Sequence, residues 1–220
     1  MTDPTPPSEL DEVIVIGTRA KRNTEIPPEE MEEVPEDGGN GGGGGGMTQA
    51  EVDAENERQK KCAAVEFKAE MQDKPTKNSK ESFSYILNRN GNTVITPPVT
   101  AAGNVITPPE RRAVITAYSI QASEILGFVH NHPRNVYCDS DDLTVRSAQI
   151  ALNAYPSAND LDSAEEFLGL NQGIDPSTFS LFVLGCDNIM REFPFSQMAV
   201  WREKVAQPNP VKPPEMEADC

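Results

Sequence analysis

The 220-residue chain has only two histidines, no excess of positive charge and no long apolar run. Its formal net charge is −16, from 35 acidic and 19 basic residues, which argues against nucleic acid as a partner because a phosphate backbone requires a basic patch. No segment approaches the ~20 consecutive apolar residues of a membrane span. The first residues are acidic and proline-rich, whereas a secretory signal peptide begins with basic and then apolar residues. We therefore expect neither a nucleic-acid nor a membrane partner.

Cysteines are also few and scattered, and no two of them form a CxxC pair; they are Cys62, Cys138, Cys186 and Cys220. In a chain of this length the pattern predicts reduced thiols and a cytoplasmic protein. Cys138 lies close to the histidines described below and could be a soft metal ligand. A buried or loop thiol is the simpler interpretation of the same residue.

Residues 1–46 are expected to form a disordered leader, because they are rich in Pro, Glu and Gly and end in six consecutive glycines. They carry 11 acidic and 3 basic residues, so half of the excess negative charge lies there. Within the leader, residues 12–19 (EVIVIGTR) include an apolar segment, Val13 to Ile16, that is typical of a strand. This segment could pair with the sheet edge of a partner protein or with the chain's own domain.

Strand and helix patterns alternate over residues 47–206, which predicts one mixed α/β domain. An Asn90-Gly91 hairpin turn is expected between strands at 81–87 and 93–95. The other predicted strands are 125–129, 179–184 and 188–193, and helices are predicted over 48–73, 108–123, 140–155 and 195–205. Residues 159–176 are interpreted as a polar connection with one helical turn at 164–168. Residues 207–220, with four prolines, are expected to be a disordered tail.

The two histidines, His130 and His132, follow the apolar segment 125–129, which predicts a buried strand. Residues i and i+2 of a strand point to the same face, so the two imidazoles should project side by side as a pair of zinc ligands. Acidic residues follow at 139–142, where a helix is predicted to begin. One of these carboxylates could be a third ligand, leaving a fourth position for water. Acids in a first helical turn are also stabilised by the helix dipole without any metal.

The segment His130-Asn131-His132-Pro133, a downstream serine and aspartate at a helix start, and an upstream glutamate resemble the JAMM motif of the MPN-domain zinc metalloproteases. The His-Asn-His-Pro form is most similar to the RadC-like and bacterial toxin-associated branches, and the resemblance spans roughly residues 79–201. It implies an MPN/JAB-like fold, in which a curved mixed sheet is flanked by helices. It also implies Zn²⁺ as the cofactor.

The resemblance implies a role for each site residue. Glu81 would be the general acid/base, although a solvated charge at a strand end is the alternative. Ser140, seven residues after the proline of the motif, would be the hydroxyl that stabilises an oxyanion. Typical members have the third ligand, an aspartate, ten residues after the proline, where this chain has Leu143. We therefore expect Asp142 to be the ligand, with Asp141 as the alternative.

The leading hypothesis from the sequence is a zinc-dependent metallohydrolase that cleaves a peptide or isopeptide bond in a peptide or protein substrate. A non-catalytic MPN-fold interaction module is the first alternative, favoured by the displaced aspartate. A bacterial effector or toxin-associated domain, deployed through the leader and exported without a cleavable signal peptide, is the second. In that interpretation a protein partner binds the segment Val13 to Ile16.

Overall fold

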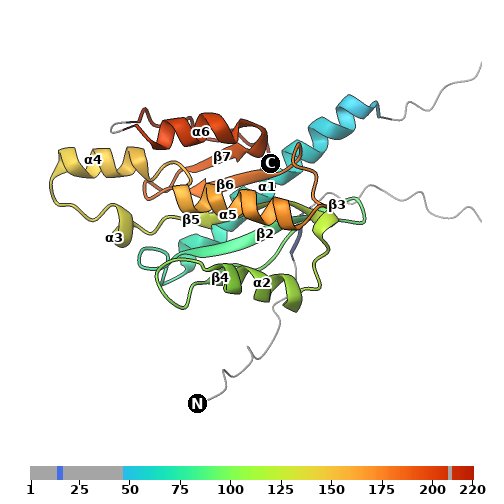
Figure 1. The fold of residues 1–220 in the computed structure, drawn as a ribbon, viewed down its shortest axis with the longest axis horizontal. Coiled ribbons are helices and arrows are strands. Elements are labelled where there is room, and N and C mark those ends of the chain that lie inside the picture. Colours follow the sequence, from blue (N-terminus) through green and yellow to red (C-terminus); the bar gives the residue numbers. More distant parts are fainter. Residues whose placement is uncertain (1–13, 17–46, 208–209) are drawn as a thin grey trace, which may run out of the picture.

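The computed structural model describes residues 14–16, 47–207 and 210–220, so most of the leader lies outside the described residues. A seven-stranded sheet has the order β1-β3-β2-β5-β6-β7, and β4 pairs with the beginning of β2 (Figure 1). The strands are β1 (Ile14–Ile16), β2 (Ser82–Arg89), β3 (Asn92–Ile95), β4 (Val99–Thr100), β5 (Ile125–Asn131), β6 (Ser180–Leu184) and β7 (Met190–Pro194). The pair β5–β6 is parallel and all other described pairs are antiparallel. The predicted mixed α/β class, with one mixed sheet flanked by helices, is confirmed.

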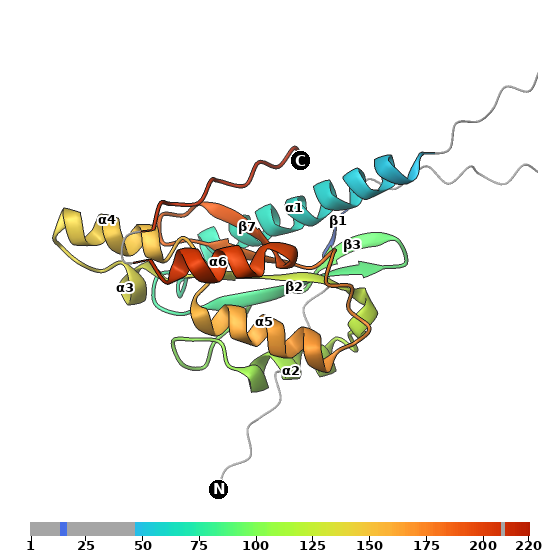
Figure 2. The same cartoon turned by 45° about the horizontal axis from the view of Figure 1, so that its top comes forward.

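Helices cover both faces of the sheet, as Figures 1 and 2 show. The α-helices are α1 (Gln49–Asp73), α2 (Pro108–Ala117), α3 (Arg134–Tyr137), α4 (Leu143–Leu152), α5 (Ala158–Leu170) and α6 (Met198–Val205). On one face α1 packs Phe67 and Met71 against Val129 of β5. On the other face α2, α5 and α6 pack against alternate residues of the same strands, including Phe128. Because side chains alternate along a strand, His130 and His132 share the α2/α5 face with Phe128.

Strand β5 lies between two partners at the centre of the sheet. His130 is opposite Phe83 of β2 on one side and Val183 of β6 on the other. At Gly127, a Cβ atom would run into the main-chain carbonyl of Ser180, so only glycine allows β6 to approach this closely. The predicted turn between β2 and β3 is confirmed, because Asn90 and Gly91 both have positive φ angles, of 54° and 77°.

Two sequence-based predictions about secondary structure and order are wrong. Residues 159–176 are expected to be a polar connection with one helical turn at 164–168, but 158–170 form the helix α5, whose buried side includes Leu161, Ala164 and Leu168. The C-terminal residues 210–220 have no helix or strand and are mostly exposed, but hydrogen bonds and a disulfide hold them against the domain. The amide of Met216 donates to the carbonyl of Met190 at the edge of β7, which brings the tail against the sheet.

The expectation of reduced thiols is also wrong, because all four cysteines are paired and none is free. Cys62 of α1 is bonded to Cys220, with Cα atoms 5.6 Å apart, and Cys138 is bonded to Cys186, with Cα atoms 6.4 Å apart. A sulfur held in a disulfide is not a thiolate ligand, so Cys138 does not serve a metal in this state. The prediction of a cytoplasmic location depended on reduced thiols and loses that support.

The apolar segment of the leader pairs with the chain's own domain. Ile14 is opposite Ile95 and Ile16 is opposite Thr93, which makes β1 the edge strand beside β3. Val13 lies outside the described residues. Of the two alternatives from the sequence, pairing within the chain is the one seen, and a protein partner for this segment stays a prediction. Among the described helices, none combines the length and apolar character of a membrane span.

Candidate metal centre

His130 of β5 and His132, which directly follows the strand, meet at their ring nitrogens. His130 and His132 are only 2% and 3% exposed, and their Nε2 atoms lie 3.1 Å apart. At this distance at least one of the two Nε2 atoms must present a lone pair, because two N–H groups cannot point at each other. The alternation of the strand therefore brings the imidazoles side by side, as the sequence predicts.

A buried carboxylate completes the group. Asp160 is 6% exposed, and its Oδ2 atom lies 3.3 Å from Nε2 of His130 and 3.6 Å from Nε2 of His132. Asp160 occupies the first turn of α5, and its carboxylate accepts hydrogen bonds from the amide (2.9 Å) and hydroxyl (2.7 Å) of Ser157. This reciprocal cap fixes both the start of the helix and the direction of the carboxylate.

The three atoms have the spacing that a small divalent cation requires. A tetrahedral zinc ion with bonds of about 2.0–2.1 Å separates its ligand atoms by roughly 3.3–3.4 Å. The observed separations of 3.1, 3.3 and 3.6 Å bracket that value. His130, His132 and Asp160 are buried and can bind a metal ion.

The electrostatics of the group favour an ionised carboxylate between two nitrogen donors. Burial by itself would raise the pKa of Asp160, but the adjacent His130 and His132 lower it well below its ordinary range. Burial likewise disfavours a charged His132, yet hydrogen bonding to Asp160 and its negative charge outweigh burial and raise the pKa of His132. A metal cation would replace the proton in this arrangement. The guanidinium of Arg111 lies 3.6 Å from Oδ1 of Asp160, on the side away from the imidazoles.

Hydrogen bonding decides which ring nitrogen of His132 can face a metal. Its Nδ1 atom lies 2.8 Å from the main-chain carbonyl oxygen of Asn153. A carbonyl can only accept, so Nδ1 carries the proton and Nε2 keeps its lone pair for the metal. Nδ1 of His130 is buried without a hydrogen-bond partner in the described part of the chain.

Glu81 lies beside this group, immediately before β2. It is 4% exposed, and each of its carboxylate oxygens accepts one hydrogen bond. Oε1 accepts from the hydroxyl of Tyr137 and Oε2 from the amide of Ile106, both at 2.8 Å. The alternative of a solvated charge at a strand end does not apply, because the side chain is buried and held by two donors.

The residue between the two histidines fixes the backbone on both sides of Glu81. Oδ1 of Asn131 accepts from the amide of Ser82 at 2.6 Å. Its Nδ2 atom donates to the carbonyls of Lys77 (2.9 Å) and Lys80 (3.3 Å). Asn131 therefore joins the end of β5 to Lys80 and Ser82, the two neighbours of Glu81 in the sequence. These bonds determine where the carboxylate of Glu81 lies relative to the histidines.

The acidic residues predicted as the third ligand do not join the histidines. Asp142 is exposed and caps α4, because its Oδ1 atom accepts from the amides of Thr144 (2.7 Å) and Val145 (3.1 Å). Asp141 is exposed and lies 3.7 Å from the guanidinium of Arg146. The structure thus corrects Asp142 and Asp141 to Asp160 as the carboxylate of the group. The helix dipole and the cap explain the acids at 141 and 142 without a metal.

Ser140 is also not seen at the centre. Its hydroxyl accepts from the amide of Asp142 at 3.2 Å, within the turn that precedes α4. The hydroxyl bound to the metal-facing carboxylate is that of Ser157, which lies 24 residues after Pro133, with Asp160 following at 27. The interval of three residues is the one that the resemblance implied for the serine and the aspartate at seven and ten.

The serine and aspartate lie later in the sequence than the resemblance implied, because residues 134–156 extend away from the sheet after Pro133 and the chain returns to it only at α5. Residues 134–156 contain α3 and α4, and Figures 1 and 2 show both helices at one end of the domain. None of the residues of α4 is buried. In the sequence, Ser157 and Asp160 could have been found as a helix cap that precedes the apolar positions Leu161, Ala164 and Leu168.

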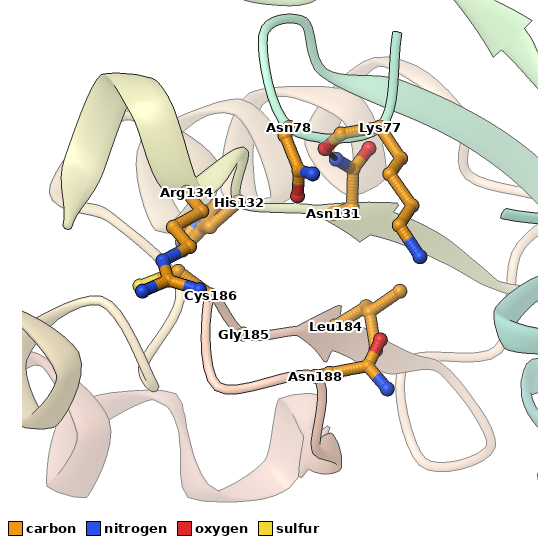
Figure 3. Close-up of a pocket in the computed structure, with 9 residues that line it drawn as sticks. All are labelled: Lys77, Asn78, Asn131, His132, Arg134, Leu184, Gly185, Cys186 and Asn188. Atoms are coloured by element: carbon orange, nitrogen blue, oxygen red, sulfur yellow. Dashed lines mark hydrogen bonds between the residues drawn. The ribbon is translucent and has the colours of Figure 1, made fainter. Parts of the chain in front are cut away.

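A small cavity of about 40 Å³ adjoins the backbone of His132 at the ends of β5 and β6 (Figure 3). Asn78 and Asn131 line one side of it, and Leu184 and Asn188 line the other. This space is large enough for ordered water beside the polar side chains that line it.

Comparison with models of protein families, with curated proteins and with solved structures returned no match for this chain.

Proposed function

We propose that this chain is a zinc-dependent metallohydrolase of the JAMM/MPN type that cleaves a peptide or isopeptide bond. The observation that carries the proposal is the buried triangle of Nε2 of His130, Nε2 of His132 and Oδ2 of Asp160, with sides of 3.1–3.6 Å. Two imidazoles and a carboxylate that are buried at this spacing require a proton or a cation between them, and a divalent metal ion fits the donor set.

The donor set favours zinc in a catalytic rather than a structural site. Two imidazole nitrogens and one carboxylate oxygen suit Zn²⁺, whereas calcium and magnesium sites use oxygen donors. Within the described residues the group contains three donors from His, Cys, Asp and Glu, so a tetrahedral ion held by them would have one position left for water or substrate. When bound, zinc would polarise a scissile carbonyl and lower the pKa of a water molecule towards 7.

The residues around the group can move and hold the protons of such a reaction. Glu81 is the buried carboxylate that would act as the general base. It would accept a proton from the attacking water and return it to the departing amine. Ser157 replaces Ser140 as the hydroxyl at the centre, because it is bonded to Asp160. With Asp160 and Ser157 in these roles, the order glutamate, His-x-His-Pro, serine, aspartate of the JAMM motif is complete in the chain.

The experiment that tests the proposal combines metal content with turnover. The purified full chain is loaded with Zn²⁺, and zinc is measured by mass spectrometry. Hydrolysis is assayed with a library of internally quenched peptides joined through main-chain or lysine side-chain amide bonds. We expect one zinc per chain and metal-dependent cleavage in the wild type. The variant Glu81→Gln should keep its zinc and lose turnover, because it removes only the proton acceptor.

Each result distinguishes the proposal from its alternatives. A wild-type protein that takes up no zinc contradicts the metal centre and the hydrolase together. A protein that binds zinc through these residues but cleaves no member of the library supports the non-catalytic module instead. Glu66→Gln changes a half-buried glutamate of α1, which packs on the other face of the sheet from the histidines; it is the matched control and should change neither quantity.

A further inference from the structure

The segment between Pro133 and α5 touches the proposed site at two points, although none of the residues of its helix α4 is fully buried. Near its beginning, Tyr137 reaches Glu81. Near its end, the carbonyl of Asn153 orients His132, as described above. The side-chain amide of Asn153 also donates to the carbonyl of Tyr137 at 3.1 Å, so the two contact points are joined to each other.

Tyr137 lies between the general base and a metal ligand. Its hydroxyl donates to Oε1 of Glu81 at 2.8 Å, and its ring centroid is 5.0 Å from that of His132. The following residue, Cys138, is bonded to Cys186 in the turn between β6 and β7. The backbone that carries Tyr137 is therefore held from two sides, by Asn153 and by the disulfide, and the hydroxyl has a defined direction.

We propose that Tyr137 is a positioning residue of the hydrolytic site, which acts by holding the carboxylate of Glu81 in its working orientation. This inference rests on the proposed function and adds to it a residue that the JAMM resemblance does not supply. A carboxylate on a free glutamate side chain rotates about its χ angles. Two donors on different oxygens, Tyr137 on Oε1 and Ile106 on Oε2, restrict that rotation and leave one lone pair on each oxygen for a proton.

The chemistry of the tyrosine suits a permanent donor. Burial and the nearby negative charge of Glu81 raise the pKa of Tyr137 above its ordinary value, which is consistent with a hydroxyl that donates to the carboxylate. A hydrogen bond to an ionised carboxylate contributes more than a neutral one, about 1.5–3 kcal/mol. If the ring only filled space, replacement by phenylalanine would have no effect on the metal centre.

The test uses a readout that does not require a known substrate. The full chain is loaded with Co²⁺, whose visible absorption reports on the metal's immediate surroundings. Spectra are recorded for the wild type, Tyr137→Phe, Glu81→Gln and the double variant. We expect the absorption maximum of Tyr137→Phe to move in the same direction as that of Glu81→Gln. In the Glu81→Gln background, Tyr137→Phe should add no further shift, because its effect passes through Glu81.

Turnover provides the second arm. On any peptide that the wild type cleaves, Tyr137→Phe should lower kcat by about tenfold or more, as expected for the loss of a charge-assisted hydrogen bond, with KM and zinc content unchanged. Tyr155→Phe is the matched control, because its hydroxyl donates to the carbonyl of Val211 in the C-terminal segment. It should leave both the Co²⁺ spectrum and kcat at wild-type values.

The possible outcomes separate this proposal from the proposed function. A wild type that binds neither Co²⁺ nor Zn²⁺ overturns both. If the wild type binds metal but Tyr137→Phe has the same spectrum as the wild type, the role of Tyr137 alone is overturned. The same holds if the shift caused by Tyr137→Phe adds fully to that caused by Glu81→Gln. If Tyr137→Phe fails to fold, replacement of Tyr137 by 3-fluorotyrosine makes the donor stronger. The absorption maximum should then move in the opposite direction, and an unchanged spectrum would again overturn the proposal.

Discussion

Oδ2 of Asp160 lies 3.3 Å from Nε2 of His130, although 30 residues separate the two in the chain. One belongs to the central strand β5 and the other to the first turn of α5, which packs across the same face of the sheet. The intervening residues form α3 and α4. The group of His130, His132 and Asp160 is thus assembled by the packing of a helix on a strand, and this relationship leads to several testable expectations.

The first concerns the identity of the carboxylate ligand. Asp160→Asn should lower the affinity for Zn²⁺ by more than roughly 100-fold, since even residues that only support metal ligands contribute 10–100-fold. Asp142→Asn should bind zinc like the wild type, because its carboxylate caps α4. Isothermal titration calorimetry of both variants measures the two affinities. Loss of zinc in Asp142→Asn with retention in Asp160→Asn would show that the third ligand is misidentified.

A second prediction concerns Asn131. Asn131→Ala removes the acceptor for the amide of Ser82 and the donor to the carbonyls of Lys77 and Lys80, all in a buried place. We expect the free energy of unfolding to fall by about 2–3 kcal/mol, because buried groups lose their partners. The rate of turnover should fall by more than the loss of folded protein accounts for. Asn135→Ala, at an exposed position of α3, is the control in denaturant titrations, and equal stability of the two variants would argue against a structural role for the hydrogen bonds of Asn131.

Strand β5 should be sensitive at Gly127. Gly127→Ala places a methyl group against the main-chain carbonyl of Ser180, which cannot move without separating β5 from β6. Gly103→Ala, where nothing lies near the new methyl group, is the matched comparison. We expect Gly127→Ala to lower both the melting temperature and zinc content, whereas Gly103→Ala changes neither. Calorimetric melting and metal analysis check this, and a Gly127→Ala protein with normal zinc content would be the contrary result.

The disulfide between Cys62 and Cys220 should stabilise the fold by closing a long loop. The two residues are 158 positions apart, for which the loss of unfolded-state entropy predicts about 3–5 kcal/mol. The double variant Cys62→Ser/Cys220→Ser should therefore unfold at lower denaturant concentration than the wild type under oxidising conditions. Addition of a reducing agent should abolish most of the difference between them. A difference that persists after full reduction would point to the serines rather than to the missing bond.

The ion pair of Asp187 predicts a loss of stability in acid. Burial would raise the pKa of Asp187, but Arg191 and Lys212 lower it to about 2, below the ordinary 3.8. A group whose pKa is lower in the folded than in the unfolded state stabilises the fold, and this stabilisation is fully present at a pH above the pKa of the unfolded state. That stability is lost as the pH falls from about 4 towards 2. Unfolding measured across this range should show a steeper decline in the wild type than in Asp187→Asn.

Asp187→Asn should also destabilise the protein at neutral pH, by about 3 kcal/mol, because Arg191 is only 1% exposed and would be left without its counter-charge. Asp162→Asn supplies the control. Asp162 is paired with Arg202 on the surface, where an ion pair contributes less than about 1 kcal/mol. Equal effects of the two substitutions would contradict the buried character of the Asp187 pair.

Much of the candidate site could be predicted from local patterns in the amino-acid sequence. The alternation of a strand places His130 and His132 on one face, and an apolar segment before them makes that strand central and buried. The position of Glu81 just before β2 and the turn at Asn90-Gly91 depend on equally short stretches. These features are predictable because neighbours in the sequence determine them.

The third ligand depended on the tertiary structure. Asp142 and Asp160 both cap helices, and their local sequences do not differ in a way that tells which helix packs beside β5. Of these two helices, only α5 has a buried apolar stripe that brings its first turn onto the histidine face, whereas α4 has no buried residue. The pairing of the cysteines and the packing of the C-terminal residues were decided in the same way. Contacts between distant segments depend on how whole elements pack, and no local pattern records them.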